Sequence, residues 1–340
     1  MKCHFIYNEL LEPGGNVFLT GLQNNFESKG RYARKSENAD IFMMNSYNKV
    51  DLLLKYKRKY PNHLFVHRID GPLKGYGNII NWRDDIVRWV NLYIADATIF
   101  QSHWAQAENQ RLKIVCTPLS TVIPNAPNPA IFNTLKRTIY TPIRKPRLIS
   151  SNWSTNWRKG FETIDWLDKH LDFDRYDMTF VGKAPIAFKN IRHIQPVKSN
   201  DMASWLKQSD IYILAASRIE ACSNALLEAL HCGVPVIGVN STSNPEFIGN
   251  GGELFEDPSE IPLKIEKILK KYAIYQRSIQ NPRLAEIADH YYSFMESCEK
   301  ERCNNTIKTL SRVQSIYLRC VVLAWKIMGT IEAMRRYERY

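Results

Sequence analysis

The chain has 340 residues, 44% of them hydrophobic and 24% charged, which excludes a disordered protein and favours two domains of about 150 residues. Lysine and arginine total 46 against 34 aspartates and glutamates, a formal net charge of +12. Such an excess favours an anionic partner, either a phosphorylated substrate or an acidic membrane surface, and no nucleic-acid-binding module is recognisable.

The first part of the chain alternates short apolar runs with stretches of helical spacing. Runs bounded by polar or turn residues are typical of buried parallel strands, and they lie at 3–7, 41–44, 64–66, 97–100 and 121–123. Helical spacing fills three of the intervals, around 18–26, 50–56 and 84–94. This alternation predicts a doubly wound parallel sheet.

A second series of strands and helices follows a stretch rich in proline and basic residues, which we interpret as a linker. Strands are expected at 147–150, 178–181, 211–215 and 234–239, and helices at about 159–170, 201–207 and 223–232. The expected divisions are a first, acceptor-side domain at 1–135, the linker at 136–146, a second, donor-binding domain at 147–305 and a helical tail at 306–340. The predicted fold class is therefore α/β, with two doubly wound Rossmann-like domains that face each other across a ligand-binding cleft.

The tail contains the longest apolar stretch, 316–334, which is interrupted by Arg319, Lys326 and Glu332. These charges make it a poor membrane span and favour a buried or surface-lying helix that returns to the first domain. The N-terminus has no apolar signal core and the seven cysteines are scattered, which favours free thiols in a reducing cytosol. Cys298 and Cys303 are too isolated to indicate a metal site, so we expect no metal.

The stretch 217–237 carries the most chemical information. A buried strand leads into a loop with Glu220, and a helix then begins at Ser223 and ends at Gly233. The free N–H groups at a helix N-terminus bind anions, so a diphosphate could be held by the amides of Ser223, Asn224 and Ala225. Glu228, further along the helix, suits the two hydroxyls of a ribose, and Glu220 suits the hydroxyls of a sugar.

This stretch resembles the signature of retaining glycosyltransferases of family 4, which have the GT-B fold. That signature is a pair of glutamates separated by seven residues, followed by small residues and a Gly-x-Pro-Val-Ile strand; the pair is Glu220 and Glu228 in this chain, flanked by Ser217 and Ala229, and the strand is 233–237. The resemblance implies sugar transfer with retention of anomeric configuration, without a metal and without an established nucleophile.

The segment 157–160 is similar to the phosphate-binding Lys-Gly loop of that family. The resemblance implies that Lys159 meets the donor's diphosphate as a point charge. The family's arginine, five residues before the lysine, is replaced by Ser154. Arg158 could substitute for it, or Ser154 and Asn156 could donate hydrogen bonds. A plain, solvated helix start is the alternative for Arg158 and Lys159.

Further segments match the family in order. Gly182, in 180–183, lies in a strand end that the family places near the donor's base, and 194–197 resembles the loop that brackets the base. Glu246 is the last residue of a degenerate Gly-Gly-x-x-Glu segment, where it could bind sugar or be a surface carboxylate. Gly14 and Gly15 precede the first helix; the family uses this loop beside the donor phosphates, although a helix-entry turn is the alternative.

Three polar residues, His67, Arg68 and Asp70, follow a buried strand at its carboxyl end, where sites form in open sheets. We expect His67 to bond the transferring sugar or the acceptor hydroxyl. Arg68 and Asp70 could bind the acceptor or sugar, or form a structural ion pair. The segment 122–126 also matches the family, with Asn125 turning the chain at the domain junction.

These features predict an enzyme that transfers a sugar from a UDP- or GDP-linked donor to a glycan or lipid-linked acceptor, without a cofactor, in surface polysaccharide or lipopolysaccharide synthesis. We expect a cytoplasmic protein attached peripherally to an anionic inner membrane face. The alternatives are a non-catalytic nucleotide-sugar-binding or scaffold subunit, which the missing arginine favours, and a GT-B-fold epimerase. A glycosidase is disfavoured, because eight residues of helix would hold Glu220 and Glu228 about 12 Å apart.

Overall fold

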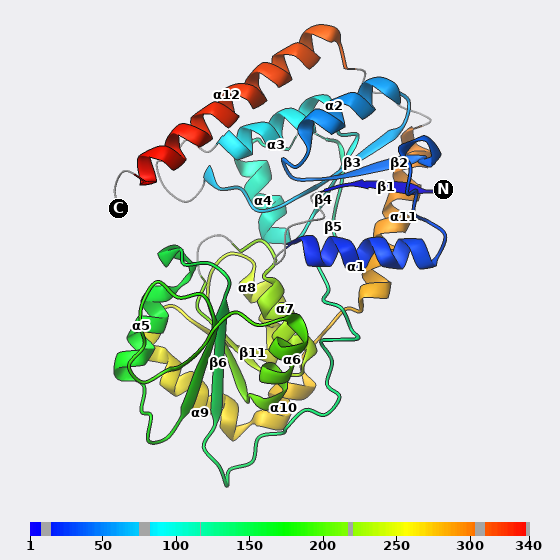
Figure 1. The fold of residues 1–340 in the computed structure, drawn as a ribbon. Helices are drawn as coiled ribbons and strands as arrows, with labels where there is room; N and C mark the ends of the chain where they lie inside the picture. The colour runs from blue at the N-terminus through cyan, green and yellow to red at the C-terminus, as the bar shows by residue number, and fades with distance from the viewer. Residues whose placement is uncertain (8–14, 75–81, 116, 217–219, 303–309, 338–340) are drawn as a thin grey trace.

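Two α/β domains make up the protein, as a computed structural model shows (Figure 1). The structure describes the chain except for residues 8–14, 75–81, 116, 217–219, 303–309 and 338–340. Each domain is built on a parallel sheet with helices on both faces. The predicted α/β class with two Rossmann-like domains is confirmed.

The first sheet consists of β1 (Cys3–Ile6), β2 (Ile41–Asn45), β3 (Leu64–Ile69), β4 (Ala97–Phe100) and β5 (Leu119–Val122), in that spatial order. Cys3 also forms a parallel bridge with Tyr32, on the side of β1 away from β2. The chain thus leaves β1 in one direction and returns past it to β2, which makes the sheet doubly wound. The resulting switch point between β1 and β2 is a place where such sheets bind ligands.

The second sheet has the order β11-β10-β9-β6-β7-β8, formed by β6 (Arg147–Asn152), β7 (Asp177–Gly182), β8 (Arg192–Ile194), β9 (Ile211–Leu214), β10 (Val236–Val239) and β11 (Gly252–Phe255). Its switch point lies between β6 and β9. All the strands expected from the sequence are present in both sheets. The two edge strands β8 and β11 were not predicted, because they are short and largely lack the buried apolar run of the central strands.

Helices cover both faces of the first sheet. One face packs against α1 (Gly15–Ser28) and α11 (Leu284–Arg302), with Phe18 and Tyr291 in the same cluster. The other face packs against α2 (Val50–Lys59), α3 (Trp82–Tyr93) and α12 (Arg312–Tyr337). The unpredicted helix α4 (His103–Arg111) follows β4 and is poor in apolar residues, which explains why its spacing gave no signal.

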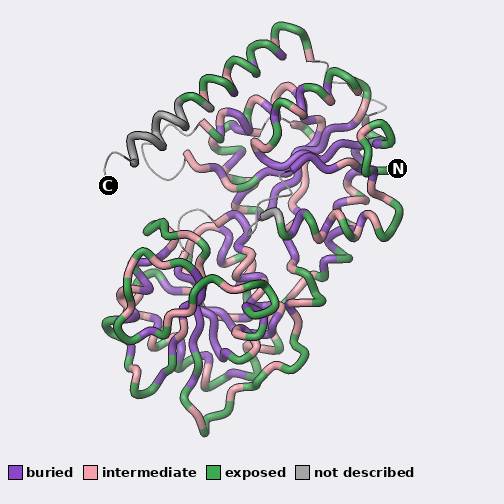
Figure 2. Tube along the Cα trace, in the orientation of Figure 1, coloured by how far each residue is buried: buried purple, intermediate pink, exposed green. Residues whose placement is uncertain are grey.

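The second sheet is also covered on both faces. The first group of helices is α5 (Phe161–His170), α9 (Ile261–Lys270) and α10 (Tyr272–Arg277). The second group is α6 (Ser199–Gln208), α7 (Asn224–His231) and α8 (Asn244–Ile248). Figure 2 shows the buried backbone concentrated in the two sheets, with the exposed chain on the outer helices and turns.

The C-terminal part of the chain crosses back to the first domain. The boundaries predicted from the sequence include 284–302 in the second domain, whereas α11 packs on α1 and β3 of the first domain. Beyond it, α12 lies across α2 and α3, as expected for a returning tail (Figure 1). In the part of the chain that the structure describes, no helix is long and apolar enough to cross a membrane.

Gly182 supplies a test of this packing. It ends β7 with a φ of +129°, and a Cβ atom there would lie 1.9 Å from the carbonyl oxygen of Asn152. Gly182→Ala should therefore lower the free energy of unfolding by about 3 kcal/mol or more. Gly30→Ala is the matched control, because Gly30 also has a positive φ but nothing within 4 Å of its Cβ position, and it should cost only about 1 kcal/mol. Equal shifts of the two variants in calorimetric melting would contradict this interpretation.

Candidate functional site

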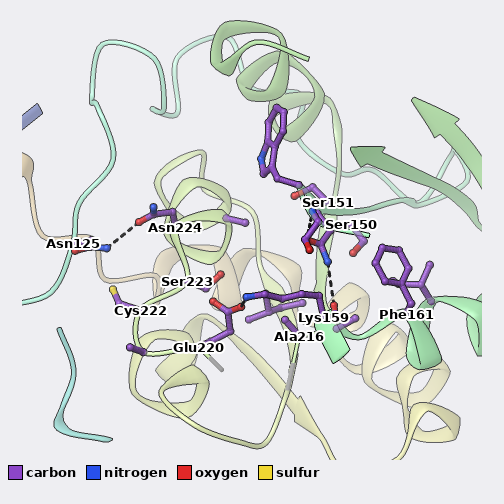
Figure 3. Close-up of a pocket in the computed structure, with 18 of the residues that line it drawn as sticks. Asn125, Ser150, Ser151, Lys159, Phe161, Ala216, Glu220, Cys222, Ser223 and Asn224 are labelled. Carbon is purple, nitrogen blue, oxygen red and sulfur yellow. Dashed lines mark hydrogen bonds and ion pairs between the residues drawn. The ribbon is translucent and has the colours of Figure 1, made fainter. Parts of the chain in front are cut away.

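A cavity of about 490 Å³ lies where the carboxyl ends of the two sheets face each other. The first domain contributes Asp70, Gln101 and Asn125, and the second contributes residues that follow β6 and β9. The cavity therefore coincides with the switch point of the second sheet, where open α/β sheets bind ligands. Figure 3 shows most of the side chains that line the cavity. The lining residues from the second domain are 150–154, Lys159, Phe161, Ile164, Phe180, 214–216 and 220–225.

Lys159 and Glu220 meet inside this cavity. The Nζ atom of Lys159 lies 2.5 Å from Oε1 of Glu220, and both side chains are partly accessible (Figure 3). Lys159 is the only cation among the described residues that line the cavity. An incoming anion would compete with Glu220 for Lys159, and the released carboxylate would then be available to hydroxyl groups.

A chain of local hydrogen bonds positions Lys159. The backbone N–H of Ser154 donates to Oδ1 of Asn152, that of Asn156 to Oγ of Ser154, and that of Arg158 to Oδ1 of Asn156. The polar side chains between β6 and α5 thus hold the loop in shape. Ser154 lines the cavity, whereas Asn156 and Arg158 are exposed and do not line it, so these two expected donor-binding residues are placed outside.

The N-terminus of α7 opens into the same cavity. Ser223 caps the helix by accepting a hydrogen bond from the N–H of Leu226 at 3.4 Å, and Ser223, Asn224 and Ala225 all line the cavity. Unsatisfied N–H groups and the helix dipole make this end of α7 favourable for an anion. The structure therefore brings together Lys159, Glu220 and the three residues at the start of α7 that the sequence singled out.

Glu228 lies on a different side of α7. It borders a small cavity between α7 and α1 together with Asn224 and Leu227, and it does not line the main cavity. Burial raises the pKa of the Glu228 carboxyl to about 8. The structure thus does not place Glu228 beside Lys159, and its predicted contact with a ribose remains a prediction.

The position of His67 does not support the role that we expected for it. The imidazole is fully buried in β3, with Nε2 2.9 Å from the carbonyl oxygen of Ser46 and Nδ1 3.4 Å from Nδ2 of Asn91. Desolvation lowers its pKa to about 4, so the ring is neutral at physiological pH. His67 is therefore a buried residue of the first domain, where its ring contacts Ser46 and Asn91.

Arg68 lies on the same strand and Asp70 directly follows its end, and the two side chains differ in exposure. The Arg68 guanidinium is fully buried, whereas the Asp70 side chain is 53% exposed and lines the main cavity. Their ion pair is long, with 3.7 Å between Nη1 and Oδ1. Gln101, at the end of β4, donates a hydrogen bond to Asp70. Gln101 was not among the predicted site residues, although its place directly after a buried strand was a usable signal.

Glu246 has a structural role between the domains. From α8 in the second domain, its carboxylate accepts hydrogen bonds from the N–H groups of His103 at 2.9 Å and Trp104 at 2.6 Å. These are the first residues of α4 in the first domain, so Glu246 satisfies a helix N-terminus across the domain boundary. The alternatives of a sugar contact or a free surface carboxylate are not supported by this position.

The predicted glycine sites are only partly described. Gly14 and Ser217 lie outside the described residues, and Gly15 begins α1. Gly182 does not line the main cavity; its close approach to Asn152 shapes the end of β6 instead. Among the described residues, no group of histidine, cysteine and carboxylate side chains could hold a metal ion.

One family profile matches a segment of this chain, and several solved structures are similar to its fold. The profile of the family described as glycosyl transferases group 1 matches residues 187–284, a segment that includes Glu220, α7 and Glu246. No curated protein sequence matches the chain significantly. The family match supports a glycosyltransferase enzyme.

The solved structures that resemble this one are distant in sequence. The lipopolysaccharide outer core galactosyltransferase WaaB is 13% identical, over 87% of this chain and 99% of that chain, with a TM-score of 0.64. HepE of Anabaena, determined in complex with UDP, is 13% identical over 89% of this chain and 99% of that chain, with a TM-score of 0.60. A glycosyltransferase from Rickettsia africae is 16% identical over 85% of this chain and 83% of that chain, with a TM-score of 0.61. These similarities confirm the GT-B fold.

The raised pKa of Glu228 predicts a pH-dependent stability. Because the folded state keeps a proton that the unfolded chain releases above its ordinary pKa of 4.5, the free energy of unfolding should fall as pH rises from about 4.5 to about 8. Glu228→Gln removes this cost and should stabilise the protein at pH 8 by on the order of 4 kcal/mol, a shift of several degrees in Tm. Glu256→Gln, at an exposed position, is the control. If the Tm of Glu228→Gln changed with pH in the same way as the Tm of the wild type over this range, the raised pKa of Glu228 would be refuted.

Proposed function

We propose that the protein is a retaining glycosyltransferase of family 4 that moves a sugar from a nucleoside-diphosphate sugar, UDP- or GDP-linked, to a glycan or lipid-linked acceptor. The observation that carries this proposal is the meeting of Lys159, Glu220 and the N-terminus of α7 in one cavity between two sheets. A cation and a helix N-terminus suit a diphosphate, and an adjacent carboxylate suits the hydroxyls of a sugar.

Charge stabilisation at the diphosphate would drive the reaction. As the bond between sugar and diphosphate breaks, negative charge grows on the leaving group, which Lys159 and the amides at the start of α7 are placed to stabilise. Glu220, freed from Lys159, would hold the sugar. The acceptor hydroxyl would attack from the face that the diphosphate leaves, so that positioning contributes much of the rate.

The acceptor would enter from the first domain. Asp70 lines the main cavity and also a neighbouring cavity of about 240 Å³, which Ser46, Tyr47, Arg83 and Asn109 border as well. An exposed carboxylate shared by the two cavities is well placed to orient an acceptor hydroxyl towards the donor. Polar side chains and the Tyr47 ring suit a sugar unit of a glycan or lipid-linked acceptor in surface polysaccharide or lipopolysaccharide synthesis.

A non-catalytic nucleotide-sugar-binding subunit is the second candidate. Ser154 stands where the family has an arginine, and its hydroxyl accepts a backbone hydrogen bond from Asn156. Arg158 is exposed and is not among the residues that line the cavity, so the described site offers one cation where the family offers two. Such a site could bind a donor without turning it over. An epimerase would turn over a donor in the absence of any acceptor.

The outer face of α12 supports peripheral attachment to an anionic cytoplasmic leaflet. One side of this helix packs on the first domain through Leu318 and Val322. At 100° per residue, the opposite side carries apolar residues, and those that are more than half exposed are Val313, Ile316, Leu323 and Ile327. A surface helix normally presents polar residues outward. Exposed Arg312 and Arg319 flank the apolar side, which is the pattern of helices that lie in a membrane interface.

Lys159→Ala tests the donor site. A lost charge-assisted contact of about 1.5–3 kcal/mol should weaken binding of the nucleoside diphosphate and lower kcat about 10–100-fold each. Arg158→Ala removes the neighbouring charge outside the cavity and is the matched control. The readouts are calorimetric binding of UDP and GDP and release of nucleoside diphosphate from their sugar conjugates. If Lys159→Ala and Arg158→Ala had identical effects, Lys159 would not belong to the donor site. If the protein bound the donor but turned it over with no acceptor, the non-catalytic nucleotide-sugar-binding subunit would be favoured.

Flotation with vesicles tests the membrane face. Wild-type protein should float with vesicles that contain anionic lipid and less so with neutral ones, because apolar insertion and basic charge act together. Ile316→Asp with Leu323→Asp should abolish flotation, whereas Leu135→Asp, at a 71% exposed apolar residue near the linker, should not. Wild-type protein that stays with the unbound fraction at low and moderate salt would exclude this surface as a membrane contact.

A further inference from the structure

A buried hydrogen-bonded chain runs from the first domain into the cavity. It begins at the Arg68 guanidinium, which is fully buried and donates from Nη1 to Oδ1 of Asn45 at 2.7 Å, from Nη2 to Oδ1 of Asn125 at 2.5 Å and from Nε to the Tyr291 hydroxyl at 3.1 Å. These partners come from β2, the segment after β5 and α11. Arg68 thus joins three parts of the first domain below the cavity.

The chain continues across the domain boundary. Asn125, which is 2% exposed, donates from Nδ2 to Oδ1 of Asn224 at 3.0 Å (Figure 3). Asn224 is the first residue of α7 and lines the cavity. The contact therefore connects the carboxyl end of the first sheet with the helix N-terminus that we assign to the diphosphate.

The orientation of both asparagines follows from the chemistry of arginine. A guanidinium has donors and no acceptor, so Asn125 must turn its carbonyl oxygen towards Arg68. Its NH₂ group must then face Asn224, which can only answer with its own oxygen. This leaves Nδ2 of Asn224 as a donor, and that atom has no partner among the described residues. Arg68 thus determines, through Asn125, which end of the Asn224 amide is free at the cavity.

We propose that Arg68 and Asn125 are positioning residues that hold Asn224 with its N–H donors free for the donor's diphosphate. This inference rests on the proposed function, since it assumes a diphosphate at the start of α7. It adds a side-chain donor to the backbone amides there, at a site where the described lining residues supply a single cation, Lys159. Because Asn125 and Asn224 belong to different domains, the donor is oriented only while the two domains are in contact.

Asn125→Asp tests the proposal with almost no change of volume. The new carboxylate can still accept from Arg68, but it can only accept from Asn224 as well. Asn224 must then rotate its amide and present oxygen, in place of N–H, to the diphosphate. We expect the Kd for UDP or GDP, whichever the wild type binds, to rise about tenfold or more. Asn45→Asp is the matched control, because Asn45 also accepts from Arg68 but is not hydrogen-bonded to Asn224, and its Kd should change by less than about twofold.

A double-mutant cycle separates orientation from charge repulsion. If Asn125 acts through Asn224, then Asn125→Asp should have little further effect in an Asn224→Ala background, whereas repulsion by the new charge would persist there. Equal melting temperatures of the variants serve as the check on folding. Wild-type protein that binds UDP or GDP while Asn125→Asp binds equally well overturns this inference alone, as does an undiminished effect in the Asn224→Ala background. Wild-type protein that binds no nucleoside diphosphate overturns the proposed function and this inference with it.

Discussion

In a parallel sheet, all strands present their carboxyl ends at the same edge, and the candidate site of this protein depends on two such edges facing each other. Asp70, Gln101 and Asn125 follow strands of the first sheet, and the loops after β6 and β9 carry the residues of the second. No single domain contains the complete site. The C-terminal helices α11 and α12 follow the second domain in the chain and pack on helices of the first domain, which adds contacts between the two parts of the chain.

Polar side chains make contacts between the two domains. Glu246 satisfies the N-terminus of α4, and Asn224 accepts from Asn125. Each contact joins a second-domain residue to the first domain close to the cavity. Asn125 is buried, and a buried polar group that loses its partner costs about 1–3 kcal/mol, so this contact would oppose separation of the domains. The contact between Asn125 and Asn224 also fixes the position of two residues that line the cavity, which links the domain arrangement to the candidate site.

Much of the fold could be predicted because the relevant signals are local. Apolar runs such as 64–66 and 211–215 became central strands, since strands buried on both faces are largely apolar. Ser223 and Gly233 are also local signals: a serine favours the start of a helix and a glycine favours its end, and together they marked α7. Short edge strands and the polar helix α4 gave no such signal. The spacing of apolar residues could not show that α11 packs on the first domain, because such spacing indicates a buried helix face without indicating which domain covers it.

The site was predictable where chemistry and chain position coincide, as for Lys159, Glu220 and the start of α7. It was less so where the same residue type serves packing. His67 stands at the end of a strand, as a catalytic histidine would, but Ser46 and Asn91 engage its ring in the core. Asn125 gave the opposite result: it was expected only to turn the chain, and its partners Arg68 and Asn224 lie 57 and 99 residues away in sequence. Only the folded chain reveals such partners.

The most direct test of the central claim is a thermal-shift screen of the purified protein with UDP, GDP, ADP, CMP and their common sugar conjugates. A ligand that binds only the native state raises the melting temperature by mass action. The account predicts a clear rise with one nucleoside diphosphate and its sugar conjugates, which the Lys159→Ala variant reduces. A well-folded sample whose melting temperature is unchanged by every nucleotide would contradict a donor site between the two sheets.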